Sequence, residues 1–98
     1  MLEQPIFLHN LEWLWWSNPS IEPEEMPFIL AFFSPMVERW LDMTRVKDNP
    51  VALETLARLL KIWQDFVSGY IHLTEYVDRP NGQFVRVGIR LEGLAELL

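Results

Sequence analysis

The segment NPVALETLARLLKIWQDFVSG, residues 49–69, constrains the fold more than any other part of the chain. Its polar residues form one narrow stripe at helical spacing, and apolar residues cover the rest of the circumference. Asn49 can cap such a helix, Pro50 suits its first turn and Gly69 can end it. A helix that is apolar around more than half of its surface must be surrounded by other elements, so we predict a central helix here.

Two shorter helical patterns precede this segment. The first runs from about Pro5 to Trp16, and its apolar face comprises Phe7, Leu8, Leu11, Leu14 and Trp15. The second runs from Pro27 to about Val46, with a predicted apolar side of Ile29, Phe33, Met36, Trp40 and Thr44. Pro35 lies within it, so either one helix is kinked there or Ser34 caps a separate helix. We favour the kinked helix.

After Gly69 the hydrophobic period changes from 3.6 to 2, which predicts two β-strands. A three-residue loop, Pro80-Asn81-Gly82, gives the most consistent register for a hairpin. In that register the buried pairs are Val77 with Val85, Leu73 with Ile89 and Ile71 with Leu91. The final EGLAELL is predicted to form a short amphipathic turn. The predicted fold is a single α+β domain, residues 1–98, with three or four helices, a C-terminal β-hairpin and a short terminal helix.

The order of three helices and a hairpin resembles a winged helix-turn-helix domain. Three short stretches carry the resemblance, which covers the last half of the chain: Gly69-Tyr70-Ile71, the tip from Arg79 to Gln83, and Leu91-Glu92-Gly93. The resemblance implies a wing and a third helix that can read DNA. The start of that helix offers Val51, Ala52, Glu54 and Thr55, which departs from the basic and amide side chains of DNA-reading members. The resemblance therefore supports the fold more than DNA binding, and winged helices also serve as protein-docking modules.

Charge is distributed unevenly along the chain. The net charge is −6, and the first basic residue is Arg39, so the N-terminal third carries only acidic side chains: Glu3, Glu12, Glu22, Glu24 and Glu25. Such a surface repels nucleic acid and anionic lipid, and it suits a basic partner. There is no cysteine, which excludes disulfides and thiolate metal sites.

The sequence predicts neither a membrane span nor a secretory signal. The longest apolar stretch, Met26 to Phe33, is too short to cross a bilayer and contains Pro27. The N-terminus lacks the basic start and small-residue cleavage site of a signal peptide. We therefore expect a cytoplasmic protein with no membrane partner.

Catalytic motifs are missing from the sequence. His9 and His72 are the two histidines, and no phosphate-binding loop, nucleophile elbow or metal-ligand spacing occurs. His9 and Glu12 can lie one helical turn apart, but a metal site needs two further ligands. We expect no enzyme activity, no cofactor and no metal.

Two groups of residues are candidates for binding. Arg79, Arg86 and Arg90, interleaved with tyrosines on the outer face of the hairpin, can contact nucleic acid or an acidic protein, or can form an ordinary solvated sheet face. A DNA-binding winged-helix regulator using these arginines is the alternative function, although the net charge disfavours nucleic acid.

The second group is the tryptophan-bearing N-terminal side. Trp13 and Trp16 point away from the apolar face of the first helix, and tryptophan is enriched where interfaces form. Either another segment covers them, or a homodimer buries them, or they bind a protein partner. We predict a small acidic, non-enzymatic interaction module, an adaptor or an inhibitor, whose partner can be basic and can belong to nucleic-acid-handling machinery. The predicted binding residues are Glu12, Trp13, Trp16, Glu22, Glu24 and Glu25.

Overall fold

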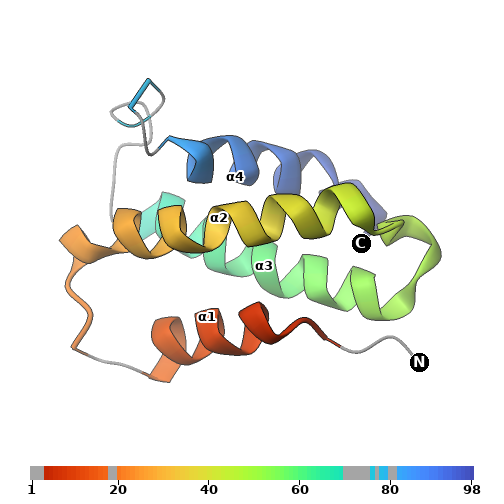
Figure 1. Cartoon of the computed structure of the whole chain (residues 1–98), viewed down its shortest axis with the longest axis horizontal. Helices are drawn as coiled ribbons and strands as arrows, with labels where there is room; N and C mark the ends of the chain where they lie inside the picture. Colours follow the sequence, from red (N-terminus) through yellow and green to blue (C-terminus); the bar gives the residue numbers. More distant parts are fainter. Residues whose placement is uncertain (1–3, 18–19, 70–75, 77, 80–81) are drawn as a thin grey trace.

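The computed structural model describes residues 4–17, 20–69, 76, 78–79 and 82–98. Four α-helices and three short 3-10 helices account for most of these residues (Figure 1). In chain order they are α1 (Ile6–Ser17), η1 (Pro23–Glu25), α2 (Met26–Met43), η2 (Val46–Asp48), α3 (Pro50–Gly69), α4 (Gln83–Gly93) and η4 (Ala95–Leu97). The described residues contain no β-strand, so the predicted α+β class is wrong and this part of the chain is all-helical.

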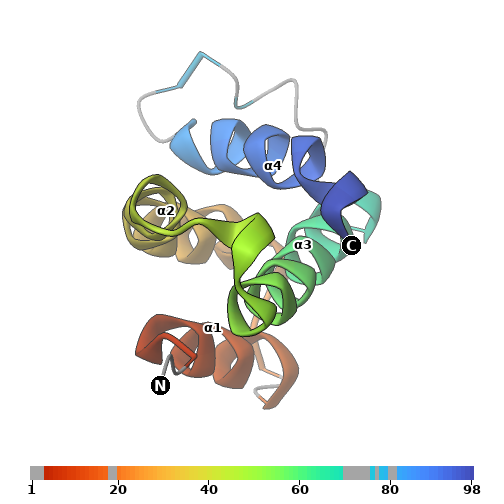
Figure 2. The ribbon, with the colours of Figure 1, turned by 90° about the vertical axis from the view of Figure 1, so that its right-hand side faces the viewer.

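The helices enclose one core. Helix α4 packs against both α2 and α3, and α1 packs against the same two helices on the opposite side of the molecule (Figure 2). Helix α3 contacts both outer helices and also η2 and η4, which confirms its predicted central position. Its buried apolar side chains alone supply a large part of the core: Ala52, Leu56, Leu59, Leu60, Ile62, Trp63 and Phe66.

The start of α3 follows the prediction. The Asn49 side-chain oxygen accepts hydrogen bonds from the backbone N–H groups of Val51, at 3.0 Å, and Ala52, at 3.4 Å. These are two of the donors that a helix start leaves without a helical partner. Pro50 is the first residue of the helix, where its missing N–H costs no hydrogen bond, and the helix ends at Gly69.

Helix α1 buries the predicted face. Leu8 and Leu11 are fully buried, and Phe7, Leu14 and Trp15 pack against the core while partly exposed. The predicted helix from Pro5 to Trp16 is thus confirmed to within one residue at each end.

Helix α2 continues through Pro35 as a single helix, as we favoured. The Ser34 hydroxyl is buried and donates to the Leu30 carbonyl one turn earlier. The buried face differs from the predicted one, because it comprises Met26, Pro27, Leu30, Phe33, Ser34, Val37 and Leu41. Met36, which we placed toward the core, is exposed.

The predicted hairpin is not supported. Its second strand is helix α4, and most of its first strand, residues 70–75 and 77, lies outside the described residues. Buried residues in α4 follow helical spacing, namely Phe84, Val87 and Leu91, with Val85 at the edge. Ile89, which the hairpin register buries, is 64% exposed. The winged-helix resemblance is therefore wrong, because the predicted second strand is a helix that packs against α2 and α3.

Side-chain contacts hold α4 in place. The Trp63 indole N–H donates to the Phe84 carbonyl at 2.8 Å, and both side chains are buried. The Phe84 ring meets Phe66 edge-on, with 5.5 Å between ring centroids, and lies 5.6 Å from the ring of Tyr76. Toward α2, Gln83 donates to Glu38 at 2.5 Å and Arg90 pairs with Asp42 at 2.8 Å. The buried aromatic contacts of Phe84 and the polar contacts with α2 thus fix the position of α4.

Candidate interaction surface

Trp13 and Trp16 lie on the outer side of α1. Their exposed fractions are 61% and 48%, so no described segment covers them as the core does Trp63. The ring of Trp16 meets Trp15 edge-on at 6.5 Å and lies 5.6 Å from the Lys61 ammonium of α3. Trp16 is therefore held between its own helix and α3, whereas Trp13 projects farther into solvent. The alternative in which another segment buries both rings does not occur among the described residues.

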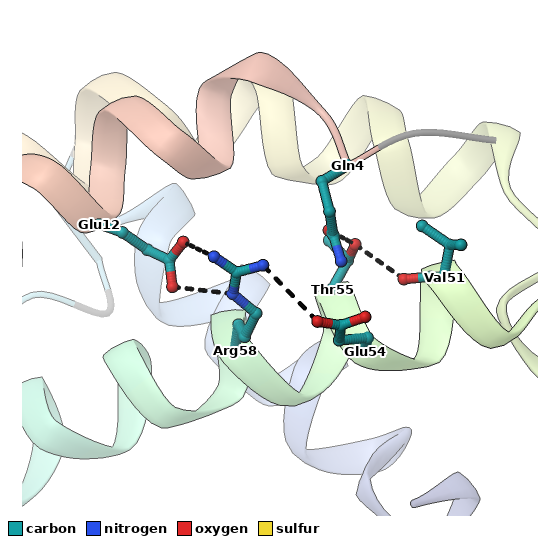
Figure 3. A network of polar contacts seen from close by, with 6 residues as sticks. All are labelled: Gln4, Glu12, Val51, Glu54, Thr55 and Arg58. Atoms are coloured by element: carbon teal, nitrogen blue, oxygen red, sulfur yellow. Dashed lines mark hydrogen bonds and ion pairs between the residues drawn. The ribbon is translucent and has the colours of Figure 1, made fainter.

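Glu12 takes part in a polar network between α1 and α3 (Figure 3). Its carboxylate receives two hydrogen bonds from Arg58, one of them from Nε at 2.9 Å, and the second oxygen contacts Nη2. Glu54 approaches the same guanidinium at 3.9 Å. The Thr55 hydroxyl, also in Figure 3, contacts the Gln4 side-chain oxygen and lies 3.0 Å from the Val51 carbonyl. The Glu12 carboxylate is thus engaged within the fold.

Arg58 keeps its charge throughout the physiological range. The hydrogen bonds that Arg58 donates to Glu12 raise the pKa of its guanidinium above the ordinary value, against the lowering effect of burial, and the charges of Glu12 and Glu54 raise it further. A raised pKa of a cationic group contributes stability at every pH below its unfolded value, and that contribution is lost only as pH rises through the folded pKa. Titration of Arg58 therefore does not change the contribution of the pair to stability near neutral pH.

The Glu12–Arg58 pair should make a small, salt-sensitive contribution to stability. The side chains are 19% and 34% exposed, so solvent screens the pair, but two-point contact is favourable geometry. In a double-mutant cycle with Glu12→Ala and Arg58→Ala, we expect a coupling of about 1 kcal/mol at low salt. Chemical denaturation at low and high salt measures it. A coupling near zero at low salt would show that the pair does not tie α1 to α3.

The remaining acidic residues of the predicted site lie in the segment that connects α1 to α2. Glu22, Glu24 and Glu25 are all exposed, and the last two belong to η1. The C-terminal end of α1 and the N-terminal end of α2 lie at the same end of the molecule (Figure 1). The structure thus brings Trp16 and the acidic residues to one end. We define the tryptophan surface as Trp13, Trp16, Glu22, Glu24 and Glu25.

The three predicted nucleic-acid-binding arginines do not share a strand face. Arg86 and Arg90 are exposed on α4, and Arg90 is paired with Asp42 of α2. The Arg79 guanidinium lies 5.0 Å from the ring of Tyr76, outside the helix. The wing that was expected to present them to DNA is not supported.

A second exposed apolar face was missed by the sequence analysis. Phe28, Phe32, Met36 and Met43 are exposed on α2, and Pro35 is exposed among them. Their spacing of three, four and seven residues places them on one side of the helix, opposite the buried face. The sequence feature that could have predicted this face is the number of apolar residues in α2. They occur on all sides of the helix, although only one side needs them to pack against the core.

Two further properties bear on the kind of site. Among the described residues, no three histidine, aspartate or glutamate side chains are grouped so that they could hold a metal ion, and His9 is exposed on α1. None of the helices described has both the length and the apolar composition needed to cross a membrane.

Comparison with known proteins gives no relative. The sequence matches no family model and no curated protein, and no solved structure is significantly similar to the fold. The surface must therefore be interpreted from its own chemistry.

Exposure of Trp13 predicts that it contributes little to stability. Trp13→Ala should change the free energy of unfolding by no more than about 0.5 kcal/mol, as is usual for surface positions. The matched change Trp63→Ala removes a buried ring and a hydrogen bond and should cost about 3–5 kcal/mol. Urea denaturation followed by circular dichroism measures both. A large loss for Trp13→Ala would mean that the ring belongs to the core.

Proposed function

We propose that this chain is a small, non-enzymatic protein-interaction module, an adaptor or an inhibitor, which binds a protein through the tryptophan surface. The observation that carries the proposal is the exposure of Trp13 and Trp16 side by side on one helix. Large aromatic side chains in water are costly, and they supply most of the binding energy where they become buried in an interface. The small role expected for Trp13 in folding supports a role in binding instead.

Charge supports a basic partner surface. Glu22, Glu24 and Glu25 are exposed at the same end of the molecule as Trp16, and the chain carries a net charge of −6. Carboxylates at the edge of an aromatic cluster speed association with a basic protein and exclude acidic ones. A protein that handles nucleic acid presents such a basic surface, and an acidic module that covers it would act as an inhibitor.

Site-specific photo-crosslinking tests this proposal. A benzoylphenylalanine at position 13 should capture a specific protein in the cells that make this chain. The same group at the exposed position of Glu92, on α4, should not capture it, because α4 lies on the opposite side of the molecule. Added unlabelled protein should compete for the adduct, and a Trp13→Ala, Trp16→Ala variant should not.

Two outcomes would overturn the proposal. One is competition by the double variant as effective as that by the unmodified protein. The other is salt-sensitive binding of duplex DNA in fluorescence anisotropy, abolished by reversing the charges of Arg86 and Arg90, which would assign the function to phosphate contacts instead.

A further inference from the structure

The exposed apolar face of α2 lies apart from the two exposed tryptophans of α1. We define the α2 stripe as Phe28, Phe32, Pro35, Met36 and Met43, with Arg39 among them. Trp16 contacts Lys61 of α3, so the aromatic end of α1 turns toward α3. The α2 stripe is instead opposite the residues that α2 buries against the core. It therefore needs an occupant of its own.

We infer that a second copy of this chain covers the α2 stripe, with the two α2 helices antiparallel. A two-fold axis that passes between Pro35 and Met36 makes the stripe match itself. It places Phe28 of one copy opposite Met43 of the other, and Phe32 opposite Arg39. The first pair is a sulfur–aromatic contact and the second a cation–π contact, both favourable once desolvated.

The charges at the two ends of α2 fit the same axis. Glu24 and Glu25, which also belong to the tryptophan surface, lie in η1 directly before the helix and are exposed. Arg45, Lys47 and Asp48 follow the end of the helix and are also exposed, which leaves a net charge of +1 there. The axis that pairs Phe32 with Arg39 brings Glu24 of one copy to Lys47 of the other. A parallel arrangement would instead oppose like charges at both ends, so charge complementarity selects the antiparallel one.

The stripe supplies most of the area that a dimer needs. Phe28, Phe32 and Met43 are 68%, 66% and 79% exposed, and Met36 adds a smaller part. With about 200 Å² for each large side chain, the stripe exposes about 500 Å², or about 1,000 Å² in two copies. A specific interface buries about 1,200–2,000 Å² in total, and the charged ends of α2 supply the remainder as a polar rim.

Sedimentation of the full chain over about 1 μM to 1 mM tests the dimer. The unmodified protein should pass from monomer to dimer within this range. Phe32→Ala removes a central aromatic contact and should weaken association about 30-fold or more. Trp13→Ala should leave it unchanged, because Trp13 lies on the other surface. The dimer and the proposed function can thus fail separately.

Charge reversal tests the antiparallel arrangement. Glu24→Lys alone should raise the dissociation constant of the dimer about tenfold, because a lysine of one copy then faces a lysine of the other at each end. Lys47→Glu alone should weaken the dimer equally, because two carboxylates then face each other. An equimolar mixture of the two variants should associate again, since each copy then supplies the charge that the other lacks. Both positions are exposed, so circular dichroism should show the fold intact. A protein that stays monomeric throughout, or variants whose mixture is no tighter than either alone, would overturn the inference.

Discussion

Replacing Phe84 with alanine is expected to lower the free energy of unfolding by about 3–5 kcal/mol, the usual cost of removing a fully buried aromatic ring. Phe84 is fully buried at the start of α4, where it meets Phe66 edge-on and packs beside Tyr76. A domain of this size has only about 5–15 kcal/mol of total stability, so the variant should be partly unfolded at modest denaturant concentrations.

Ile89→Ala is the matched control for Phe84→Ala. The hairpin register buries Ile89 and exposes Phe84, whereas helix α4 does the opposite. Ile89→Ala should therefore change the free energy of unfolding by no more than about 0.5 kcal/mol. Urea denaturation of both variants decides between the two structures. A larger loss for Ile89→Ala than for Phe84→Ala would restore the hairpin.

Gly88→Val is expected to destabilise the fold by about 2–3 kcal/mol, since overpacking a well-filled core typically costs about 1–3 kcal/mol. A Cβ atom at Gly88 would lie 2.8 Å from Cδ1 of Trp63. The indole cannot easily move away, because it is buried and its N–H donates to the Phe84 carbonyl. Valine gains only a few tenths of a kcal/mol over glycine in helix propensity, so the clash determines the sign.

Gly93→Val separates this clash from the general effect of replacing a helical glycine. Gly93 is the last residue of α4, and no atom lies within 4 Å of the position that its Cβ would occupy. The change should alter stability by no more than about 0.5 kcal/mol. Thermal and urea unfolding of both variants measure the difference. Equal effects at the two glycines would show that α4 does not approach Trp63 closely.

Local signals were sufficient to predict α1 and α3. The ends of α3 are marked by residues whose effect on the backbone is local, namely Asn49, Pro50 and Gly69. The predicted cap forms, since the Asn49 side chain accepts hydrogen bonds from the first turn of the helix. The apolar face of α1 is equally local. Such features depend little on the rest of the chain, which is why they can be read from the sequence.

Helix α4 could not be recognised in the same way, because its apolar residues fit both the period of a helix, 3.6, and that of a strand, 2. Val85, Val87 and Leu91 are buried in the structure and would also be buried in the hairpin, so they do not discriminate. Its β-branched residues also favour a strand locally. Tertiary packing favours the helix, because it buries Phe84 in the core and lets Gly88 approach Trp63. Neither contact can be predicted from the local sequence.

The sequence predicted the exposed tryptophans of α1 but not the exposed apolar face of α2. Trp13 and Trp16 stand out because the opposite face of α1 is clearly apolar, and both are exposed. Helix α2 is apolar on every side, so the sequence does not say which of its residues α1 and α4 will cover. The choice of Leu30 and Val37 over Phe28 and Phe32 depends on neighbours that are distant in the chain.

The most direct test of the account is the affinity of the crosslinked partner for Trp13→Ala and Trp16→Ala, measured by calorimetry beside the Ile89→Ala control. We expect each tryptophan variant to bind at least about 30-fold more weakly than the unmodified protein, the loss typical of an interface hot spot, with the fold intact. Ile89→Ala should bind normally, because Ile89 is exposed on α4, away from α1. Unchanged affinity of both tryptophan variants would contradict the account.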